Sequence, residues 1–172
     1  MRLQADFYMQ SAPILAPLLL GKVLCRKLAD ETLRYPITET ESYVGNCDTA
    51  CHAYKGKTPR NSVMYEQGGA SYVYLCYGIH NLFNVVTGNK GEAEAVLIRG
   101  VSGFNGPGKL TKAMQIDRSL NGIDLINSDQ LWLEDHGIKL EFTVTPRIGI
   151  DYADERDRER LWRFVAEDNN WR

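Results

Sequence analysis

The sequence predicts an α+β fold in which helices surround a mixed, mostly antiparallel β-sheet within one domain, residues 1–172. Strand-forming segments outnumber helical ones along the chain. Two of them, residues 71–77 and 82–87, flank the short segment Gly78-Ile79-His80-Asn81, which is typical of a hairpin and therefore of antiparallel pairing. No repeat, linker or low-complexity stretch suggests a domain boundary, and 172 residues suffice for one buried core.

Six segments have the β-forming or alternating patterns that predict strands. They are residues 22–26, 33–43, 71–77, 82–87, 95–101 and 138–145. Pro36 is best tolerated near an edge or a bulge, and residues 95–101 are expected to form a central strand. Residues 44–60 are rich in turn formers and polar groups, so we expect an irregular loop there.

Four segments are expected to be helical. The first follows Ser11, a good N-cap, and continues through the apolar run 12–20, which Pro13 and Pro17 interrupt. This run falls far short of the roughly 20 residues of a membrane span, and we expect a buried helix rather than a signal peptide. The second is a short helix capped by Asn61 and ending at Gly68-Gly69, and the third begins at Gly106-Pro107-Gly108 and continues to Gln115. The fourth is a charged helix over 154–166 with Leu161, Trp162 and Val165 on one face.

The composition narrows the functional class. Apolar residues make up 44% and charged residues 24%, which is ordinary for a globular protein and excludes a disordered chain, a collagen or a coiled coil. Four cysteines are too few for a disulfide framework, so a reduced, intracellular protein is expected. Cys47, Cys51 and His52 lie close in sequence, but a fourth ligand is not evident, and we expect no metal site and no cofactor.

The charge is distributed unevenly. The net charge is −2, yet residues 51–120 contain eight Lys and Arg against four Asp and Glu, whereas residues 121–172 contain seven against twelve. One face could therefore meet phosphates while another stays acidic, although clustering in sequence says little about clustering in space.

Two segments have the residue types of a functional site. Strand alternation places Glu39, Glu41 and Tyr43 on one face, and His52 follows in the next loop; a solvated edge strand is the alternative. In the hairpin, aromatic residues usually serve sheet packing. Tyr77 and Ile79, however, fall at the tip, where exposed apolar side chains suggest insertion into something such as a base stack.

These segments resemble the monofunctional alkyladenine (3-methylpurine) DNA glycosylases. The resemblance runs colinearly from Phe7 to about Trp171. It is densest in ITETESYVGNCDTACH (37–52), KTPRN (57–61), YVYLCYGIHNLFNVV (72–86), VLIRG (96–100) and GPGKL (106–110). It implies an enzyme that flips a damaged purine out of duplex DNA and hydrolyses its N-glycosidic bond without a metal.

The resemblance also implies roles for single residues. Glu41 matches the general base that activates water. Arg99 matches an arginine that helps hold this water and the carboxylate, and Ile148 matches a position whose backbone carbonyl contacts the water. Tyr43, His52 and Tyr74 match the lining of the base pocket, and Asn84 a residue that rejects the 2-amino group of guanine. Tyr77 matches the wedge that fills the gap left in the duplex, with Ile79 beside it.

Basic residues near these segments are candidates for phosphate contacts. Lys57 and Arg60 are expected to position the protein on the DNA backbone without reading sequence. Lys109 lies in the turn that opens the third helix, where backbone N–H groups can also meet a phosphate; a plain tight turn is the alternative.

Two other functions fit parts of the sequence. A non-catalytic module that binds distorted or damaged DNA would not require Glu41 with Arg99, and a hydrolase of free nucleosides would leave the wedge Tyr77 without a role. We therefore expect a monomeric enzyme whose partner is double-stranded DNA containing damaged purines and which has no membrane partner.

Overall fold

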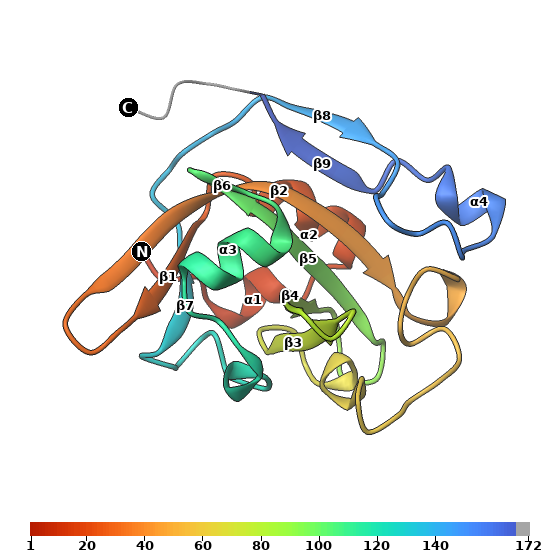
Figure 1. Cartoon of the computed structure of the whole chain (residues 1–172), viewed down its shortest axis with the longest axis horizontal. Helices are drawn as coiled ribbons and strands as arrows, with labels where there is room; N and C mark the ends of the chain where they lie inside the picture. Colours follow the sequence, from red (N-terminus) through yellow and green to blue (C-terminus); the bar gives the residue numbers. More distant parts are fainter. Residues whose placement is uncertain (168–172) are drawn as a thin grey trace.

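The computed structural model describes residues 1–167; Trp171, where the family resemblance ends, lies outside them. Its centre is a nine-stranded, curled antiparallel sheet with few and short helices (Figure 1). The strands are β1 (Val23–Lys27), β2 (Thr32–Val44), β3 (Ser71–Cys76), β4 (His80–Thr87), β5 (Glu94–Val101), β6 (Phe104–Asn105), β7 (Leu131–Glu134), β8 (Phe142–Thr145) and β9 (Arg163–Ala166). The predicted antiparallel pairing is thereby confirmed, but all pairs of described strands are antiparallel rather than mixed, and the helices are too few and short to surround the sheet.

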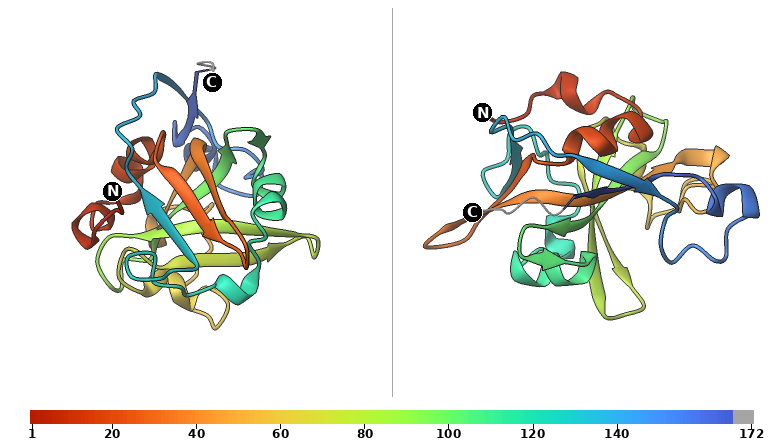
Figure 2. Two further views of the ribbon diagram at one scale, coloured as in Figure 1. Left: turned by 90° about the vertical axis from the view of Figure 1, so that its left-hand side faces the viewer. Right: turned by 90° about the horizontal axis from the view of Figure 1, so that it is seen from above.

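The main path of the sheet runs β3-β4-β5-β2-β1-β7, with β6 added beside β5, and with β9 and then β8 added beside β2. The α-helices are α1 (Ala5–Tyr8), α2 (Ala12–Leu19), α3 (Pro107–Ala113) and α4 (Glu155–Arg158), and single 3₁₀ turns cover Gly45–Cys47, Ser62–Tyr65 and Arg118–Leu120. Figure 2 shows α1 and α2 on one side of the sheet, and α3 with the β3–β4 hairpin on the other. Among the described residues, no helix is long and apolar enough to cross a membrane.

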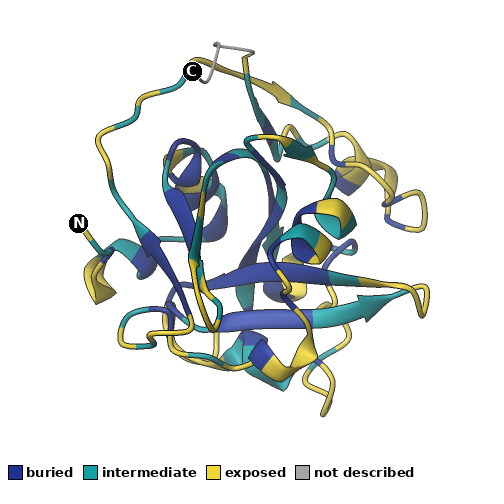
Figure 3. Cartoon of the chain, turned by 60° about the vertical axis from the view of Figure 1, so that its left-hand side comes forward, coloured by how far each residue is buried: buried dark blue, intermediate teal, exposed yellow. Residues whose placement is uncertain are grey.

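The hydrophobic core lies mainly between the sheet and α2. Val85, Val96 and Ile98 contribute from β4 and β5, and Leu15 and Leu19 from α2; all five are fully buried. In contrast, the outer end of the β3–β4 hairpin is exposed, while its base is buried (Figure 3). The hairpin therefore projects from the body of the protein on a rigid base.

Side chains of the sheet satisfy the backbone of α2. Pro17 has no N–H to donate within the helix. At the end of the helix, Leu20 N donates to the Pro17 carbonyl, so the Ala16 carbonyl receives no bond from Leu20 N. The Ala16 carbonyl accepts from Thr40 Oγ1 of β2 at 2.9 Å. Ser11 stands at the predicted N-cap but makes no side-chain capping bond; Glu94 Oε2 of β5 accepts from Ala12 N at 2.7 Å. The start of this helix thus depends on tertiary contacts that the local sequence does not encode.

The predicted helix over 154–166 is wrong. Only Glu155–Arg158 are helical, and Arg163–Ala166 form β9, which pairs with Glu39–Glu41 of β2 and with β8. This part of β2 lies beyond the end of its pairing with β1, so its edge is open to another strand. Pairing with a distant strand therefore outweighed the local helical pattern.

Three smaller expectations also differ from the structure. The predicted strand 138–145 begins only at Phe142, and β7 was not predicted. Asn61 precedes a 3₁₀ turn but makes no capping bond to it, because its Oδ1 accepts from Thr58 N at 2.7 Å, while its Nδ2 donates to the carbonyls of His52 and Gly56. It therefore tightens the loop around His52 rather than starting a helix.

We expect Thr40→Val to lower the free energy of unfolding by about 1–3 kcal/mol, because it leaves the buried Ala16 carbonyl without a donor while keeping the side-chain shape. Chemical denaturation measures the loss. Thr143→Val is the matched control, since Thr143 is exposed on β8. Similar small losses in both variants would contradict the role given to the Thr40 hydroxyl.

Candidate active site

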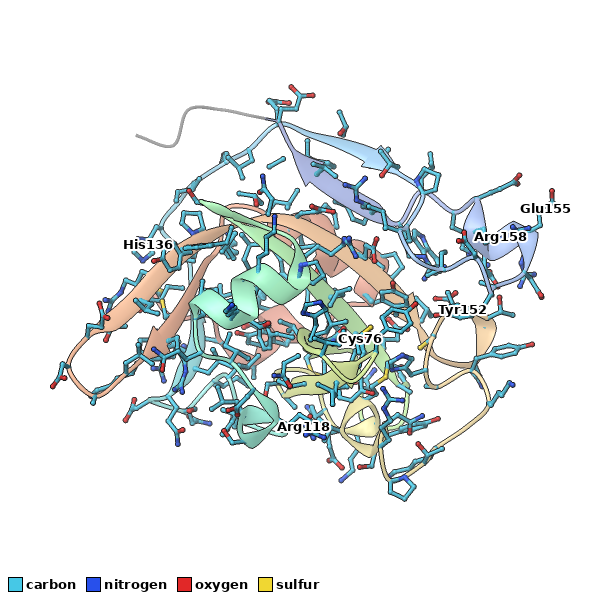
Figure 4. The ribbon with its side chains drawn as sticks, viewed as in Figure 1. Cys76, Arg118, His136, Tyr152, Glu155 and Arg158 are labelled. Carbon is cyan, nitrogen blue, oxygen red and sulfur yellow. The ribbon has the colours of Figure 1, made fainter. Side chains whose placement is uncertain are left out.

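A cavity of about 660 Å³ opens on the side of the sheet that holds α3 and the β3–β4 hairpin. Its walls come from β2, β3, β4 and β5, from the loop around His52, from the start of α3 and from the segment 148–152. Figure 4 labels Cys76 of the hairpin and Tyr152, two lining residues that come from distant parts of the chain. This volume is that of an ordinary small-molecule or nucleotide site.

One row of paired residues across four strands sets the floor of the cavity. Glu41 of β2 pairs with Leu97 of β5, Leu97 with Asn84 of β4, and Asn84 with Tyr72 of β3. Residues that pair across strands point to the same face of a sheet. Thr40 and Ser42, the neighbours of Glu41, point to the opposite face and bond to α2. The predicted alternation along β2 is therefore confirmed.

Glu41 lies at the inner end of this row, with its side chain fully buried. Its Oε1 accepts from Ile148 N at 2.7 Å, and its Oε2 accepts from the Tyr43 hydroxyl at 2.8 Å. Burial raises the pKa of Glu41, whereas the nearby Arg99, the Ile148 N–H and the Tyr43 hydroxyl oppose this rise. The net direction is upward, so this carboxyl is more basic than an exposed glutamate.

Arg99 links Glu41 to a second carboxylate. Its Nε lies 3.6 Å from Glu41 Oε1 and donates to Glu39 Oε1 at 3.0 Å, while Arg163 Nε donates to the same Glu39 oxygen at 2.6 Å. Two register shifts flank Glu39 in the β2–β5 ladder, where Glu39 pairs with Gly100. A Cβ on Gly100 would lie 3.0 Å from Thr38 Oγ1, so glycine suits this close approach.

A buried ion pair holds the segment that carries Ile148. Arg147 donates to both oxygens of Asp48, at 2.6 and 2.9 Å, and neither side chain is exposed. Arg147 also donates to the carbonyl of Ser42, between Glu41 and Tyr43, and to the Asp157 carbonyl. The pair thus ties the Ile148 segment to β2 and to the loop that leads to His52.

Aromatic rings and an imidazole form one wall of the cavity. The His52 ring lies 4.5 Å from the Tyr74 ring centroid, and its Nδ1 is 3.2 Å from the Tyr72 hydroxyl. Burial and the charge of Arg60 lower the pKa of His52, so the neutral imidazole is favoured. Tyr43 also lines the cavity, beneath the guanidinium of Arg147 at 4.9 Å. Such a wall can hold a flat, partly polar ring.

Asn84 lies on the cavity floor, 3% exposed. Its Nδ2 donates to the backbone carbonyl of Tyr72 at 3.1 Å, which orients the amide within the sheet. Any group that enters the cavity at this point therefore meets a side chain that cannot rotate freely.

The tip of the hairpin consists of Tyr77, Gly78 and Ile79. Tyr77 is 88% exposed and Ile79 73% exposed, and Tyr77 has a φ of 50°, which a non-glycine residue adopts only at some cost. The tip lies beside the cavity, because Tyr77 also lines it. An exposed aromatic ring is thus held at the mouth of the cavity.

The chain was compared with known proteins. The family model for methylpurine-DNA glycosylases matches residues 6–104 and 102–170. The chain belongs to the methylpurine-DNA glycosylase family. It is 46% identical to a protein of Borreliella burgdorferi over 96% of both chains, and 41% identical to a protein of Clostridium tetani over 99% of this chain and 98% of that relative. Both relatives are named, provisionally, as 3-methyladenine DNA glycosylases.

Membership of this family confirms the resemblance predicted from the sequence, and the structure places most of the predicted site residues together. Nine of the predicted site residues line the cavity: Tyr43, His52, Arg60, Tyr74, Tyr77, Asn84, Arg99, Lys109 and Ile148. Glu41 lies behind this lining. Lys57 and Ile79 do not line it; Lys57 lies over the Tyr65 ring, 5.4 Å from its centroid. Ile148 offers its N–H to Glu41, whereas a contact of its carbonyl with water stays a prediction.

Several residues of the site were not predicted. Tyr72 shares its face of the hairpin with Tyr74 and Asn84, so strand alternation could have found it. Asp48 and Arg147 lie far apart in the chain, and no local pattern connects them. Cys51 lines the cavity while Cys47 is exposed, and among the described residues no cluster of three or more His, Cys, Asp or Glu has the geometry of a metal site.

We expect Asp48→Asn to lower the free energy of unfolding by about 3–5 kcal/mol, because the buried Arg147 charge loses its counter-ion. Denaturant titration measures the change. Asp129→Asn is the control: Asp129 is 90% exposed and lies 3.6 Å from Arg2, and its loss should cost less than about 1 kcal/mol. Equal losses would mean that Arg147 is adequately solvated without Asp48.

Proposed function

We propose that the protein is a base-excision-repair DNA glycosylase that removes alkylated or deaminated purines of the 3-methyladenine, 7-methylguanine, hypoxanthine and etheno-adenine class from duplex DNA. The observation that carries the proposal is the Glu41 carboxylate, buried beside a nucleotide-sized cavity and held by Ile148 N, the Tyr43 hydroxyl and Arg99. A buried carboxylate is costly unless it is paired, so its presence calls for a function. The names of the relatives support the same activity.

The hairpin tip supports recognition of duplex DNA. A purine inside the duplex is out of reach of any buried group, so it must be flipped into the cavity. The exposed Tyr77 ring can fill the space that the purine leaves and thereby offset part of the lost stacking, with Ile79 beside it. The flipped purine then stacks against Tyr43 and Tyr74, with His52 as a hydrogen-bonding edge.

The chemical step is hydrolysis. Each carboxylate oxygen of Glu41 holds one hydrogen bond in the structure and retains a further lone pair. Because the Glu41 side chain has no exposed surface, a water can reach this lone pair only when the cavity lining shifts to admit it. The water oxygen bonds to C1′ as the bond from C1′ to the purine nitrogen breaks, and Glu41 takes the proton of the water. The electron pair of the broken bond leaves with the purine: an alkylated, cationic purine departs neutral, and a neutral purine departs as an anion that takes a proton from the Glu41 carboxylic acid or from solvent. Arg99 keeps the carboxylate ionised until that step. The products are the free purine and an abasic site.

Asn84 can supply selectivity. Its amide is oriented by the Tyr72 carbonyl on the cavity floor, so the 2-amino group of guanine would collide with it or leave a polar group unpaired. Hypoxanthine, etheno-adenine and 3-methyladenine have no 2-amino group. 7-Methylguanine keeps the 2-amino group, so Asn84 disfavours it as well as normal guanine. Its release therefore depends on the weaker glycosidic bond of a cationic purine.

The alternative is a module that binds damaged DNA without cutting the glycosidic bond. Such a module would use the hairpin and the aromatic wall but would gain nothing from a buried carboxylate with a raised pKa. A hydrolase of free nucleosides would use Glu41 but not an exposed tyrosine at the cavity mouth. The combination of both features favours the glycosylase.

We expect Glu41→Gln to lower single-turnover excision by about 10²-fold or more while binding of damaged duplex persists, because the amide cannot accept the proton. The wild-type rate should fall on the acid side with a midpoint above the ordinary glutamate pKa, since the raised pKa of Glu41 makes the carboxylate protonate earlier as pH falls. Borohydride should trap no covalent adduct. Near-normal excision by the variant would place the base elsewhere, with Glu39 the first candidate.

We expect Tyr77→Ser to impair flipping rather than hydrolysis. Excision should fall most for stably paired lesions and least for mismatched or single-stranded ones, which need less unstacking. Tyr54→Ser is the control, because Tyr54 is exposed but does not line the cavity. A uniform loss in all contexts would show that Tyr77 has no wedge role.

A further inference from the structure

The charged side chains that line the cavity all have the same sign. They are Arg60, Arg99 and Lys109, and within the described part of the chain no Asp or Glu lines the cavity. Glu41 lies behind the lining with no exposed surface. A purine in this cavity therefore lies directly beside positively charged side chains. It does not contact the Glu41 carboxylate, which is proposed to act on it only through the attacking water.

These three cations are not equally neutralised. Arg99 lies 3.0 Å from Glu39 and 3.6 Å from Glu41, so its charge is balanced. Arg60 and Lys109 make no ion pair with any described carboxylate, and both side chains are exposed; Arg60 Nη2 donates to the neutral carbonyl of Leu75 at 3.0 Å. The charge of Arg60 is therefore screened by water but balanced by no carboxylate, and unlike Lys109 it lies against a ring of the aromatic wall.

Arg60 also contacts the ring that a flipped purine is proposed to use. Its guanidinium carbon lies 5.6 Å from the centroid of the Tyr74 ring, within the range of a cation–π interaction. A cationic purine stacked on Tyr74 would draw on the same electron-rich ring and would be repelled by the guanidinium. A neutral purine would lose nothing by either effect.

Damaged purines fall into these two classes. Alkylation at N3 or N7 makes the purine cationic, whereas hypoxanthine and etheno-adenine are neutral. Resting on the proposed function, we propose that Arg60 is a specificity-determining residue that disfavours cationic alkylated purines relative to neutral damaged purines.

This role differs from the phosphate contact predicted from the sequence. A guanidinium that donates to Leu75 and covers Tyr74 is turned toward the hairpin and the cavity wall. Loss of a phosphate contact would weaken binding to all duplexes alike and reduce its salt dependence. Loss of a charge beside the base changes the ratio between lesions.

The test compares Arg60→Gln, which removes the charge but keeps a polar planar group, with Arg60→Lys, which keeps the charge. Single-turnover excision of 7-methylguanine and of hypoxanthine is measured in the same duplex sequence at one fixed pH no higher than neutral. There 7-methylguanine keeps its positive charge, and the lowered pKa of His52 favours the neutral imidazole. Arg118→Gln is the matched control, because it removes an exposed arginine that does not line the cavity (Figure 4).

The ratio of 7-methylguanine to hypoxanthine excision should rise about 3- to 10-fold in Arg60→Gln and stay near the wild-type value in the other two variants. Because both rates come from one preparation, a partly unfolded sample does not alter the ratio. An unchanged ratio in Arg60→Gln, an equal shift in Arg60→Lys, or a uniform loss with a weaker salt dependence would overturn the role of Arg60. Release of neither base by the wild type would instead overturn the proposed glycosylase.

Discussion

The ion pair between Asp48 and Arg147 is the constraint on which the geometry of the site depends. It joins the loop before His52 to the segment that offers Ile148 N to Glu41, and Arg147 also bonds to the β2 backbone between Glu41 and Tyr43. Both charges are fully buried, so the pair is retained only because its hydrogen bonds are nearly complete. Stability and the orientation of the buried carboxylate therefore rest on the same contact.

Strand pairing in the sheet is the second constraint on the geometry of the site. Glu41, Asn84 and Tyr72 come from three strands, yet strand pairing alone places them in one row. The loops then add His52 and Ile148 from either side. Rigid strands thus determine the spacing of the site, and the loops close it around a ring-shaped ligand.

The sequence predicted those features that depend on local patterns. Alternation placed Glu39, Glu41 and Tyr43 on one face, and the turn between two β-forming segments identified the hairpin with Tyr77 at its tip. The sequence-based predictions were wrong where a residue distant in the chain determines the local structure. Residues 163–166 pair with β2 instead of continuing a helix, and Glu94 rather than Ser11 caps α2. The phosphate contact of Arg60 stays a prediction; its bond to the Leu75 carbonyl requires the folded hairpin, so no local pattern could predict that bond.

The β3–β4 hairpin contributes both to the wall of the cavity and to the exposed tip beside it. Tyr72 and Tyr74 face the cavity from β3, while Tyr77 stands at the turn only three residues beyond Tyr74. Because successive side chains on a strand point to opposite faces, inserting or deleting a single residue between Tyr74 and Tyr77 would turn one of these rings away from its place. The length of this hairpin is thereby more tightly constrained by its geometry than the residue types at its tip.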